Sequence, residues 1–256
     1  MNQTVCPVTG FALVEGLMTG YRVAKKEYGP VSPLPRDATA TPRVRATWGR
    51  FDVPGKTVYA AADTATAIIE SLAWTAQNHR QSHAMQKTAN QLGMSLDDLL
   101  KQIAKELDEN GAMKQGAIPA GWRLDRQVFK LQISPHWLVD LSSADTIAAI
   151  NEHYLEILTA QNLTTERITL SDLTGGTRGL TQFIAEKIAS TKLYDRSIPD
   201  GLLYPSKLGS AGTGQGHCYA LWPSSTIKIS EVDSVPITLD TPGIKQAEKL
   251  HGIRIY

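Results

Sequence analysis

The chain has almost no net charge and no long apolar run. In 256 residues, 26 Lys and Arg side chains oppose 25 Asp and Glu side chains. This balance creates no global field that would steer the protein toward DNA or an anionic membrane. A transmembrane helix needs about 18 or more consecutive apolar residues, and the sequence has no such run. We therefore expect no direct nucleic-acid binding and no membrane association.

Cysteine is scarce. Cys6 and Cys218 are far apart in the sequence and form no CxxC or Cys/His spacing. This usage is typical of a reduced compartment and excludes a cysteine-rich zinc site. The first residues also lack the basic segment and apolar run of a signal peptide. We therefore expect a cytoplasmic protein.

Motifs for metals, nucleophilic serines and dinucleotide folds are missing too. The sequence contains no HExxH and no GxSxG, and its GTGQG at 212–216 precedes a predicted strand instead of a helix. Among six histidines, His79 and His83 have i,i+4 spacing, but such a lone pair on a polar stretch is more often solvated than metal-bound. We predict no metal site and no prosthetic group.

One stretch, residues 48–73, concentrates informative residues. Val53–Lys56 contains a Pro-Gly pair and predicts a turn. Residues 57–61 then predict a strand, and Asp63 or Thr64 can cap a helix that runs to Ala73. These elements carry a basic, an aromatic and an acidic residue, namely Arg50, Tyr59 and Glu70. Together they suit a ligand with phosphate, a ring and a sugar.

Simpler interpretations of the same residues stay open. Arg50 and Arg22 could brace the proline-rich loop at 27–43, and Tyr59 could be a core residue with a satisfied hydroxyl. Ser206 could fix a turn. The pattern around Glu70 favours an exposed helix face, because a buried carboxylate is costly unless it is paired.

The proline-rich loop is also basic. We favour a solvated loop for Arg36 and Arg43, although guanidinium groups there could instead form a rim that binds anions. Gly175-Gly176 near a predicted helix start could cradle phosphate, but without a full GxxxxGK[ST] pattern this signal is weak.

The remaining elements alternate irregularly and predict an α+β fold in a single domain. Predicted strands cover residues 20–24, 128–133, 137–141, 200–206 and 218–222, and predicted helices cover 144–160 and 181–191. Residues 1–20 are mixed and interrupted by glycines, and we expect a poorly determined start there. The domain would comprise an extension at 1–19, a main part at 20–223 with a helical insertion at about 79–122, and an extension at 224–256 packed on it. Within the insertion, Ser95 can cap a helix that ends at Asn110-Gly111.

Four segments together resemble the signature of RES-domain proteins. They are GYRVAKKEY at 20–28, GRFDVPGKTVYAAADTATAIIESL at 49–72, WLVDLSS at 137–143 and DGLLYPSKLG at 200–209. Their order and element types agree with the family over about residues 20–223, interrupted near 79–122. Phe51 stands where the family commonly has Trp. The resemblance implies an ADP-ribosyltransferase-like fold, with mixed and antiparallel sheets flanked by helices.

The resemblance also implies site residues. The matching positions are Arg22, Tyr28, Arg50, Tyr59, Glu70 and Ser206. Carried over, Glu70, Arg50 and Ser206 are expected to be catalytic. Arg22, Tyr59 and Tyr28 are expected to bind NAD, with Tyr28 the weakest match in spacing.

The implied activity is cleavage of the nicotinamide–ribose N-glycosidic bond of NAD, by hydrolysis or by phosphorolysis with phosphate as co-substrate. The implied role is the toxin of a toxin–antitoxin pair, whose partner is a helical, DNA-binding antitoxin. Two alternatives stay open: a protein mono-ADP-ribosyltransferase, and a non-catalytic RES-like binding module. Homo-oligomerisation is also left open.

Overall fold

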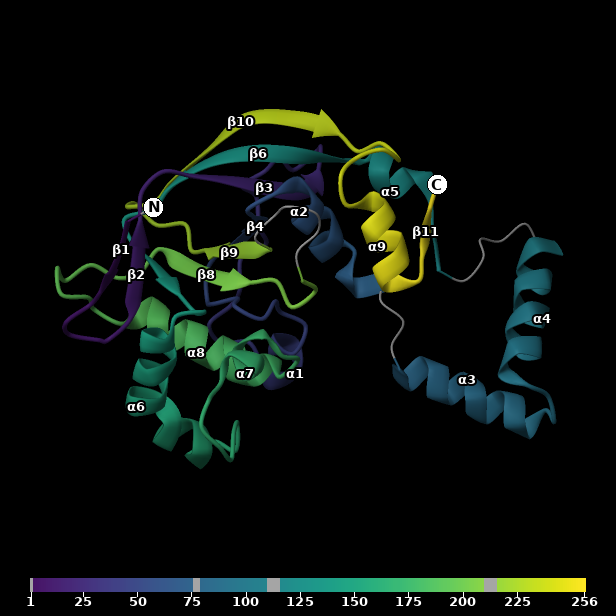
Figure 1. Ribbon diagram of the computed structural model, residues 1–256, viewed down its shortest axis with the longest axis horizontal. Helices are drawn as coiled ribbons and strands as arrows, with labels where there is room; N and C mark the ends of the chain where they lie inside the picture. Colours follow the sequence, from purple (N-terminus) through teal and green to yellow (C-terminus); the bar gives the residue numbers. More distant parts are fainter. Residues whose placement is uncertain (1, 76–78, 110–115, 210–215) are drawn as a thin grey trace.

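A computed structural model of the chain describes residues 2–75, 79–109, 116–209 and 216–256, and its centre is one large sheet (Figure 1). The strands of this sheet are β1 (Asn2–Val5), β2 (Ala12–Glu15), β3 (Met18–Lys25), β4 (Val58–Ala61), β6 (Arg126–Ser134), β7 (Leu138–Asp140), β8 (Gly201–Pro205), β9 (His217–Leu221) and β10 (Lys228–Pro236). Their order is β1-β2-β7-β8-β9-β4-β3-β6-β10. Neighbouring strands run antiparallel, except that β7 and β8 are parallel.

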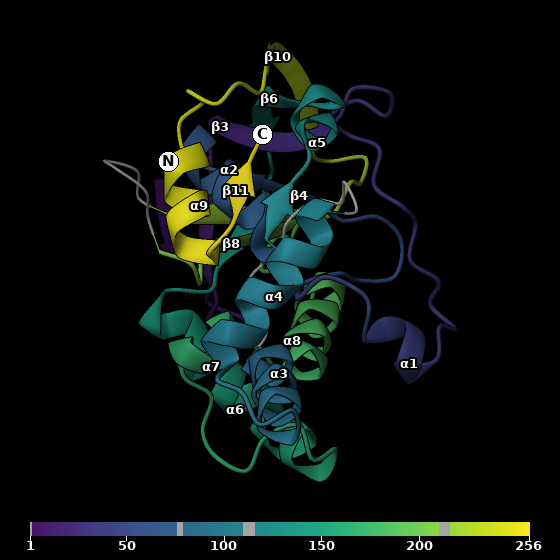
Figure 2. The ribbon, with the colours of Figure 1, turned by 90° about the vertical axis from the view of Figure 1, so that its right-hand side faces the viewer.

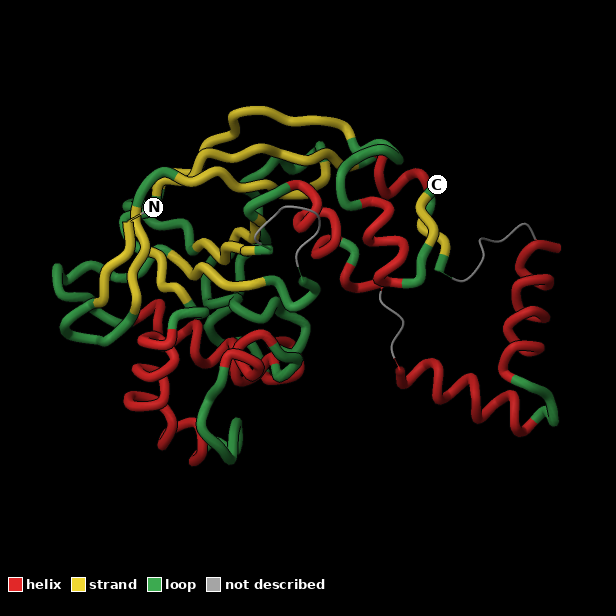
Figure 3. The backbone as a smooth tube through the Cα atoms, viewed as in Figure 1, coloured by secondary structure: helices red, strands yellow, loops and turns green. Residues whose placement is uncertain are grey.

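Helices flank this sheet, and a small parallel sheet lies beside it (Figures 1 and 3). The helices are α1 (Pro42–Arg45), α2 (Thr64–Ser71), α3 (His79–Gln91), α4 (Leu96–Glu109), α5 (Ala120–Leu124), α6 (Ala144–Ala160), α7 (Leu170–Thr174), α8 (Arg178–Ser190) and α9 (Ile244–His251), with a 3-10 turn at Ala73–Thr75. The small sheet pairs β5 (Ala117–Ile118) with β11 (Arg254–Ile255). The predicted α+β class, with a mixed sheet flanked by helices, is confirmed. Among the described helices, none has both the length and the apolar character needed to cross a membrane.

The large sheet curls so that part of its own inner face becomes a core. One buried cluster consists almost entirely of strand residues from β2, β3, β4, β6, β7, β8 and β9, including Val14, Val58, Leu131, Leu138 and Leu221. These strands span most of the sheet order, so their side chains can meet only if the sheet bends toward itself. The right-handed twist of strands favours such bending.

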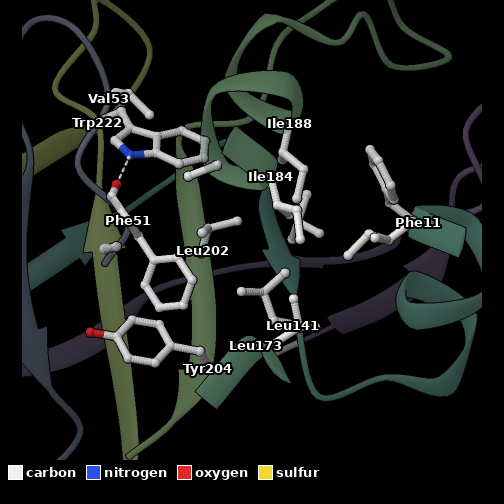
Figure 4. Packing of buried hydrophobic residues seen from close by; sticks show 14 of the residues in the cluster. Phe11, Phe51, Val53, Leu141, Leu173, Ile184, Ile188, Leu202, Tyr204 and Trp222 are labelled. Atoms are coloured by element: carbon white, nitrogen blue, oxygen red, sulfur yellow. Dashed lines mark hydrogen bonds between the residues drawn. The ribbon is translucent and has the colours of Figure 1, made fainter. Parts of the chain in front are cut away.

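The outer face is covered by two groups of helices. α6, α7 and α8 pack over the β7–β8–β9 side, where Ile184 and Ile188 of α8 join Phe51, Leu202 and other buried side chains (Figure 4). At the other end, α2 and α9 pack with the small sheet. The site described below lies between these two groups, because α2 and α8 each contribute residues to it.

The expectation of a poorly determined start at residues 1–20 is wrong. β1 pairs with β2, and β2 lies between β1 and β7. Ala12, Leu13 and Val14 are all buried, so both faces of β2 are covered. A strand covered on both faces has no polar–apolar alternation, which explains why the pattern gave no strand signal.

Two helices, α3 and α4, lie between residues 79 and 109, within the range given to the insertion. Ser95 accepts a hydrogen bond from the Asp98 N–H at 3.1 Å, which is the predicted cap of α4. The predicted end of this helix, at Asn110 and Gly111, lies outside the described residues. Figure 1 shows α3 and α4 to one side of the sheet, beyond α9, at a steep angle to each other, and in Figure 2 this α3–α4 pair faces the viewer.

Candidate functional site

The large sheet opens between β3 and β4. β3 pairs with β6 from Met18 to Lys25, whereas the ladder described between β3 and β4 has the single pair Tyr21–Ala61. Beside that pair, the Arg22 guanidinium Nη1 donates to the Tyr59 carbonyl oxygen at 2.8 Å. A side chain thus satisfies a carbonyl that a regular ladder would pair with a backbone N–H. The opening leaves room for a ligand between the strands.

A cavity of about 460 Å³ lies at this opening. The lining contains aromatic and apolar side chains together with five charged residues: Arg22, Arg50, Glu70, Arg178 and Lys207. Tyr59 and Tyr204 form part of its wall. Of the six residues carried over from the resemblance, four therefore line one cavity, and a fifth, Ser206, contacts it through Glu70.

Glu70 is positioned by α2. The Asp63 carboxylate caps this helix, accepting from the Thr66 N–H and hydroxyl at 2.8 Å each, as the sequence predicted. Ile68 and Ile69 bury the opposite face. Glu70 is half-buried and faces the cavity, so it does not lie on the exposed face that the helix pattern favoured.

Ser206 orients the Glu70 carboxylate. Its hydroxyl donates to Glu70 Oε1 at 2.5 Å and accepts from the Leu208 N–H at 3.1 Å. The Leu208 bond occupies a lone pair, so the single hydroxyl proton is directed at the carboxylate. Within the described residues, Glu70 Oε2 has no hydrogen-bond partner, which leaves this oxygen available to a ligand.

Arg50 is held by a carbonyl and two rings. Its Nη1 donates to the Thr174 carbonyl oxygen at 2.7 Å. Its guanidinium carbon lies 5.4 Å from the Phe51 ring centroid and 5.5 Å from that of Tyr204. The two rings lie 4.6 Å apart and are seen side by side in Figure 4. Cation–π contact therefore fixes Arg50 while most of its donors stay free.

Tyr59 offers the cavity its ring rather than its hydroxyl. The hydroxyl accepts from the Phe51 N–H at 3.0 Å and lies beside the Asp52 carboxylate. Burial, and then the nearby Asp52 charge, raise the pKa of Tyr59 well above its usual range. The hydroxyl is thus neutral and already hydrogen-bonded, so a ligand in the cavity would contact the face of the ring.

Arg22 brings an uncompensated positive charge. Burial lowers the pKa of Arg22, but a guanidinium keeps its proton in proteins. Its Nε is buried and has no hydrogen-bond partner among the residues that the structure describes. A buried donor without a partner is costly, and an anion in the cavity would offset that cost by attracting the charge.

Tyr28 is not brought to this site. Its side chain is 61% exposed, it does not line the cavity, and Lys25 Nζ lies 5.5 Å from its ring centroid. Arg36, favoured as a solvated loop residue, instead pairs with the buried Asp52 carboxylate at 2.7 Å. Arg43 is exposed, as the solvated interpretation expected.

The structure adds residues that the sequence analysis did not select. Arg178 begins α8, with Thr177 between it and Gly175-Gly176, and Lys207 follows Ser206. The glycine pair beside a helix start and the SK dipeptide of DGLLYPSKLG were the available signals. Cys218 also lines the cavity, but burial raises the pKa of its thiol, so it is protonated and a poor nucleophile.

Metal ligands do not gather in this region. In the parts of the chain that the structure describes, no three His, Cys, Asp or Glu side chains cluster so that they could hold a metal ion. Cys6 and Cys218 are both buried and form no disulfide.

No family model matches the chain. No curated protein matches it in sequence. Among solved structures, a chain in the crystal structure of the M. tuberculosis MbcT–MbcA toxin–antitoxin complex is similar at 13% identity with a TM-score of 0.41. The similarity covers 94% of this chain and 92% of that chain. A likeness this low does not indicate a shared activity or partner.

Proposed function

We propose that this protein consumes NAD by cleaving the nicotinamide–ribose N-glycosidic bond, and that it is the toxin of a toxin–antitoxin pair. The observation that carries the proposal is the Glu70 carboxylate, oriented by Ser206 at 2.5 Å and facing a cavity with Arg22 and Arg50. The segments that hold these residues are the ones that resemble RES-domain proteins.

The chemistry needs few groups. Nicotinamide in NAD is a cationic leaving group, so it departs as a neutral molecule without a general acid. The bond to the ribose C1′ breaks with both electrons going to nicotinamide, which leaves an oxocarbenium-like ribose. Glu70 Oε2 would accept a ribose hydroxyl and stabilise this positive charge as it develops.

The second half of the reaction adds a nucleophile to C1′. Water or phosphate attacks, and the proton released from water passes to solvent or through Glu70. Arg22 and Arg50 would hold the diphosphate, or an incoming phosphate, by charge-assisted hydrogen bonds. The products would be nicotinamide with ADP-ribose or its 1″-phosphate.

The direct test is incubation of purified protein with NAD, with and without phosphate, followed by assay of free nicotinamide. We expect nicotinamide release by the wild type, and a loss of about 10²-fold or more in Glu70→Gln, because the charge opposite the oxocarbenium is removed. Glu152→Gln, which changes an exposed carboxylate on α6, is the matched control and should keep full activity.

Three outcomes distinguish the candidate functions. Free nicotinamide without a protein acceptor supports the proposed enzyme. Label transferred from NAD to protein supports a mono-ADP-ribosyltransferase instead. NAD binding with no turnover, or turnover that persists in a folded Glu70→Gln variant, contradicts the proposed mechanism.

The toxin role needs a test in cells. Expression of the wild type should arrest growth, Glu70→Gln should not, and co-expression of the protein encoded beside it should restore growth. If that neighbour is an antitoxin, it should co-purify with the chain. Equal arrest by wild type and Glu70→Gln would show that NAD cleavage is not the cause.

A further inference from the structure

The cavity carries more positive charge than Arg22 and Arg50 account for. Arg178 and Lys207 also line it, so four cations face one described carboxylate, Glu70. The whole chain has a formal net charge of only +1. The excess is therefore local to this site and is not a general property of the surface.

These cations are not neutralised by the protein. In the described part of the chain, none of the four forms a salt bridge, whereas nearby Arg36 and Arg45 pair with Asp52 and Glu186. The cavity arginines are instead anchored on backbone carbonyls. Arg178 Nη1 donates to the Ala46 carbonyl oxygen at 3.0 Å. Arg22 and Arg50 each donate to a backbone carbonyl oxygen in the same way.

A carbonyl anchor orients a guanidinium without cancelling its charge. Each such bond uses one of five N–H donors and leaves the rest of the planar fork free. Uncancelled like charges repel one another, so the arrangement is favourable only when an anion binds among them. An anion with two or more charges matches it best.

Arg178 lies where two hollows meet. It borders the cavity and also a second hollow of about 520 Å³, lined by residues of α1 and α8 such as Arg45 and Phe183. Gln182 of α8 donates to the carbonyl oxygens of Arg45 and Gly49, which ties α8 to the segment that carries Arg50. A ligand that reaches from the cavity to this hollow therefore passes Arg178.

We propose that Arg178 and Lys207 bind the diphosphate of a dinucleotide at the mouth of the cavity, and that they select ligands with two linked phosphates over those with one or none. The naming of a dinucleotide rests on the proposed function, whereas the need for a polyanion rests on the charges alone. Arg178 and Lys207 are both exposed, so removal of either side chain should not disturb the core.

Calorimetry with ADP, AMP and adenosine tests this without any turnover. We expect ADP to bind the wild type at least about tenfold more tightly than AMP, and adenosine to bind weakest. Arg178→Ala should weaken ADP binding roughly 10- to 100-fold, as expected for loss of a charge-assisted contact, and Lys207→Ala somewhat less. Adenosine binding should not change in either variant.

Matched controls and a second variant keep the result interpretable. Arg167→Ala and Lys192→Ala remove exposed cations outside the cavity and should leave ADP binding unchanged. Arg178→Lys, which keeps the charge but loses the fork, should fall between wild type and Arg178→Ala. Melting temperatures would show that each variant is folded.

The outcomes separate this inference from the proposed function. If ADP fails to bind the wild type, or binds Arg178→Ala and Lys207→Ala with unchanged affinity, the inference is wrong even if NAD is cleaved. If ADP binding depends on Arg178 while NAD is never cleaved, the inference holds and the proposed reaction fails.

Discussion

At the scale of single residues, the proposed mechanism depends most on the hydrogen bond from the Ser206 hydroxyl to Glu70. The Leu208 N–H, which donates to the same hydroxyl, helps to fix the direction of this bond. We expect Ser206→Ala to lower kcat for NAD cleavage about tenfold or more with little change in KM, since the carboxylate would lose its orientation rather than the ligand its contacts. Nicotinamide release over a range of NAD concentrations measures both constants.

Ser171→Ala is the control for this change, because Ser171 is exposed on α7. It should leave kcat and KM unchanged. A Ser206→Ala variant that raised KM and kept kcat would show that Ser206 binds substrate directly and does not act by positioning Glu70.

A second residue-scale prediction concerns acid stability. Hydrogen bonds from the Ser197 hydroxyl at 2.6 Å, and then from Trp137 Nε1 at 2.9 Å and the Ser197 N–H, hold the pKa of Asp195 well below its usual range. The folded state therefore binds this proton less tightly than the unfolded state. The resulting stabilisation is complete above about pH 4 and is lost as the pH falls below it.

Asp195→Asn should weaken the pH dependence of the free energy of unfolding in this acidic range. Its free energy of unfolding, measured by urea denaturation between pH 3 and pH 7, should fall less on acidification than that of the wild type. Asp125→Asn, which changes an exposed carboxylate, should keep the wild-type slope. An Asp195→Asn profile parallel to the wild type would contradict the prediction.

At the scale of elements, local signals predicted α2 well and the first strands badly. Asp63 as a cap and a stripe of apolar residues are local features, and the structure contains both. β2 exists because β1 and β7 pair with its two edges, and neither neighbour is visible from residues 12–15 alone. A strand defined by distant partners leaves little pattern in its own sequence.

The position of α2, and with it Glu70, depends on a close approach by α9. Gly243 is the N-cap residue just before α9 and has φ +97°, and a Cβ added there would lie 2.6 Å from the Ala65 carbonyl oxygen. His251 Nε2 also lies 3.1 Å from the Ile69 carbonyl oxygen. Gly243→Ala should therefore destabilise the protein by several kcal/mol, through the positive φ and the backbone collision together.

Gly252→Ala is a matched control, because Gly252 also has a positive φ, +65°, but an added Cβ would meet nothing within 4 Å. It should cost only about 1 kcal/mol. Urea denaturation of both variants gives the difference, which isolates the contact between α9 and α2. Equal losses would show that the contact tolerates a methyl group.

At the scale of the whole molecule, the sequence could predict the α+β class but not the shape of the sheet. The opening between β3 and β4 depends on where Arg22 meets Tyr59, 37 residues away. Arg178 and Lys207 reach the cavity only because the start of α8 and the residues just after β8 lie beside it. Such contacts follow from long-range pairing, so they were missed where no motif carried them.

The α3–α4 pair lies apart from the buried clusters of the domain. Among the side chains that the structure describes, none from residues 79–109 belongs to one of the three buried clusters or lines the cavity. Ala89 and Leu99 are buried, and α3 packs against α4. The α3–α4 pair therefore buries a few apolar side chains of its own and adds little to the domain core.

Replacement of residues 79–109 by a Gly/Ser linker of about ten residues should accordingly shift the thermal midpoint by no more than a few degrees and preserve ADP binding. Replacement of α9 by a similar linker is the contrasting variant. That helix contributes Ile244 and Ala247 to a buried cluster, so its loss should abolish cooperative unfolding. If the replacement of residues 79–109 also unfolds the protein, these residues stabilise the domain through contacts other than its three buried clusters.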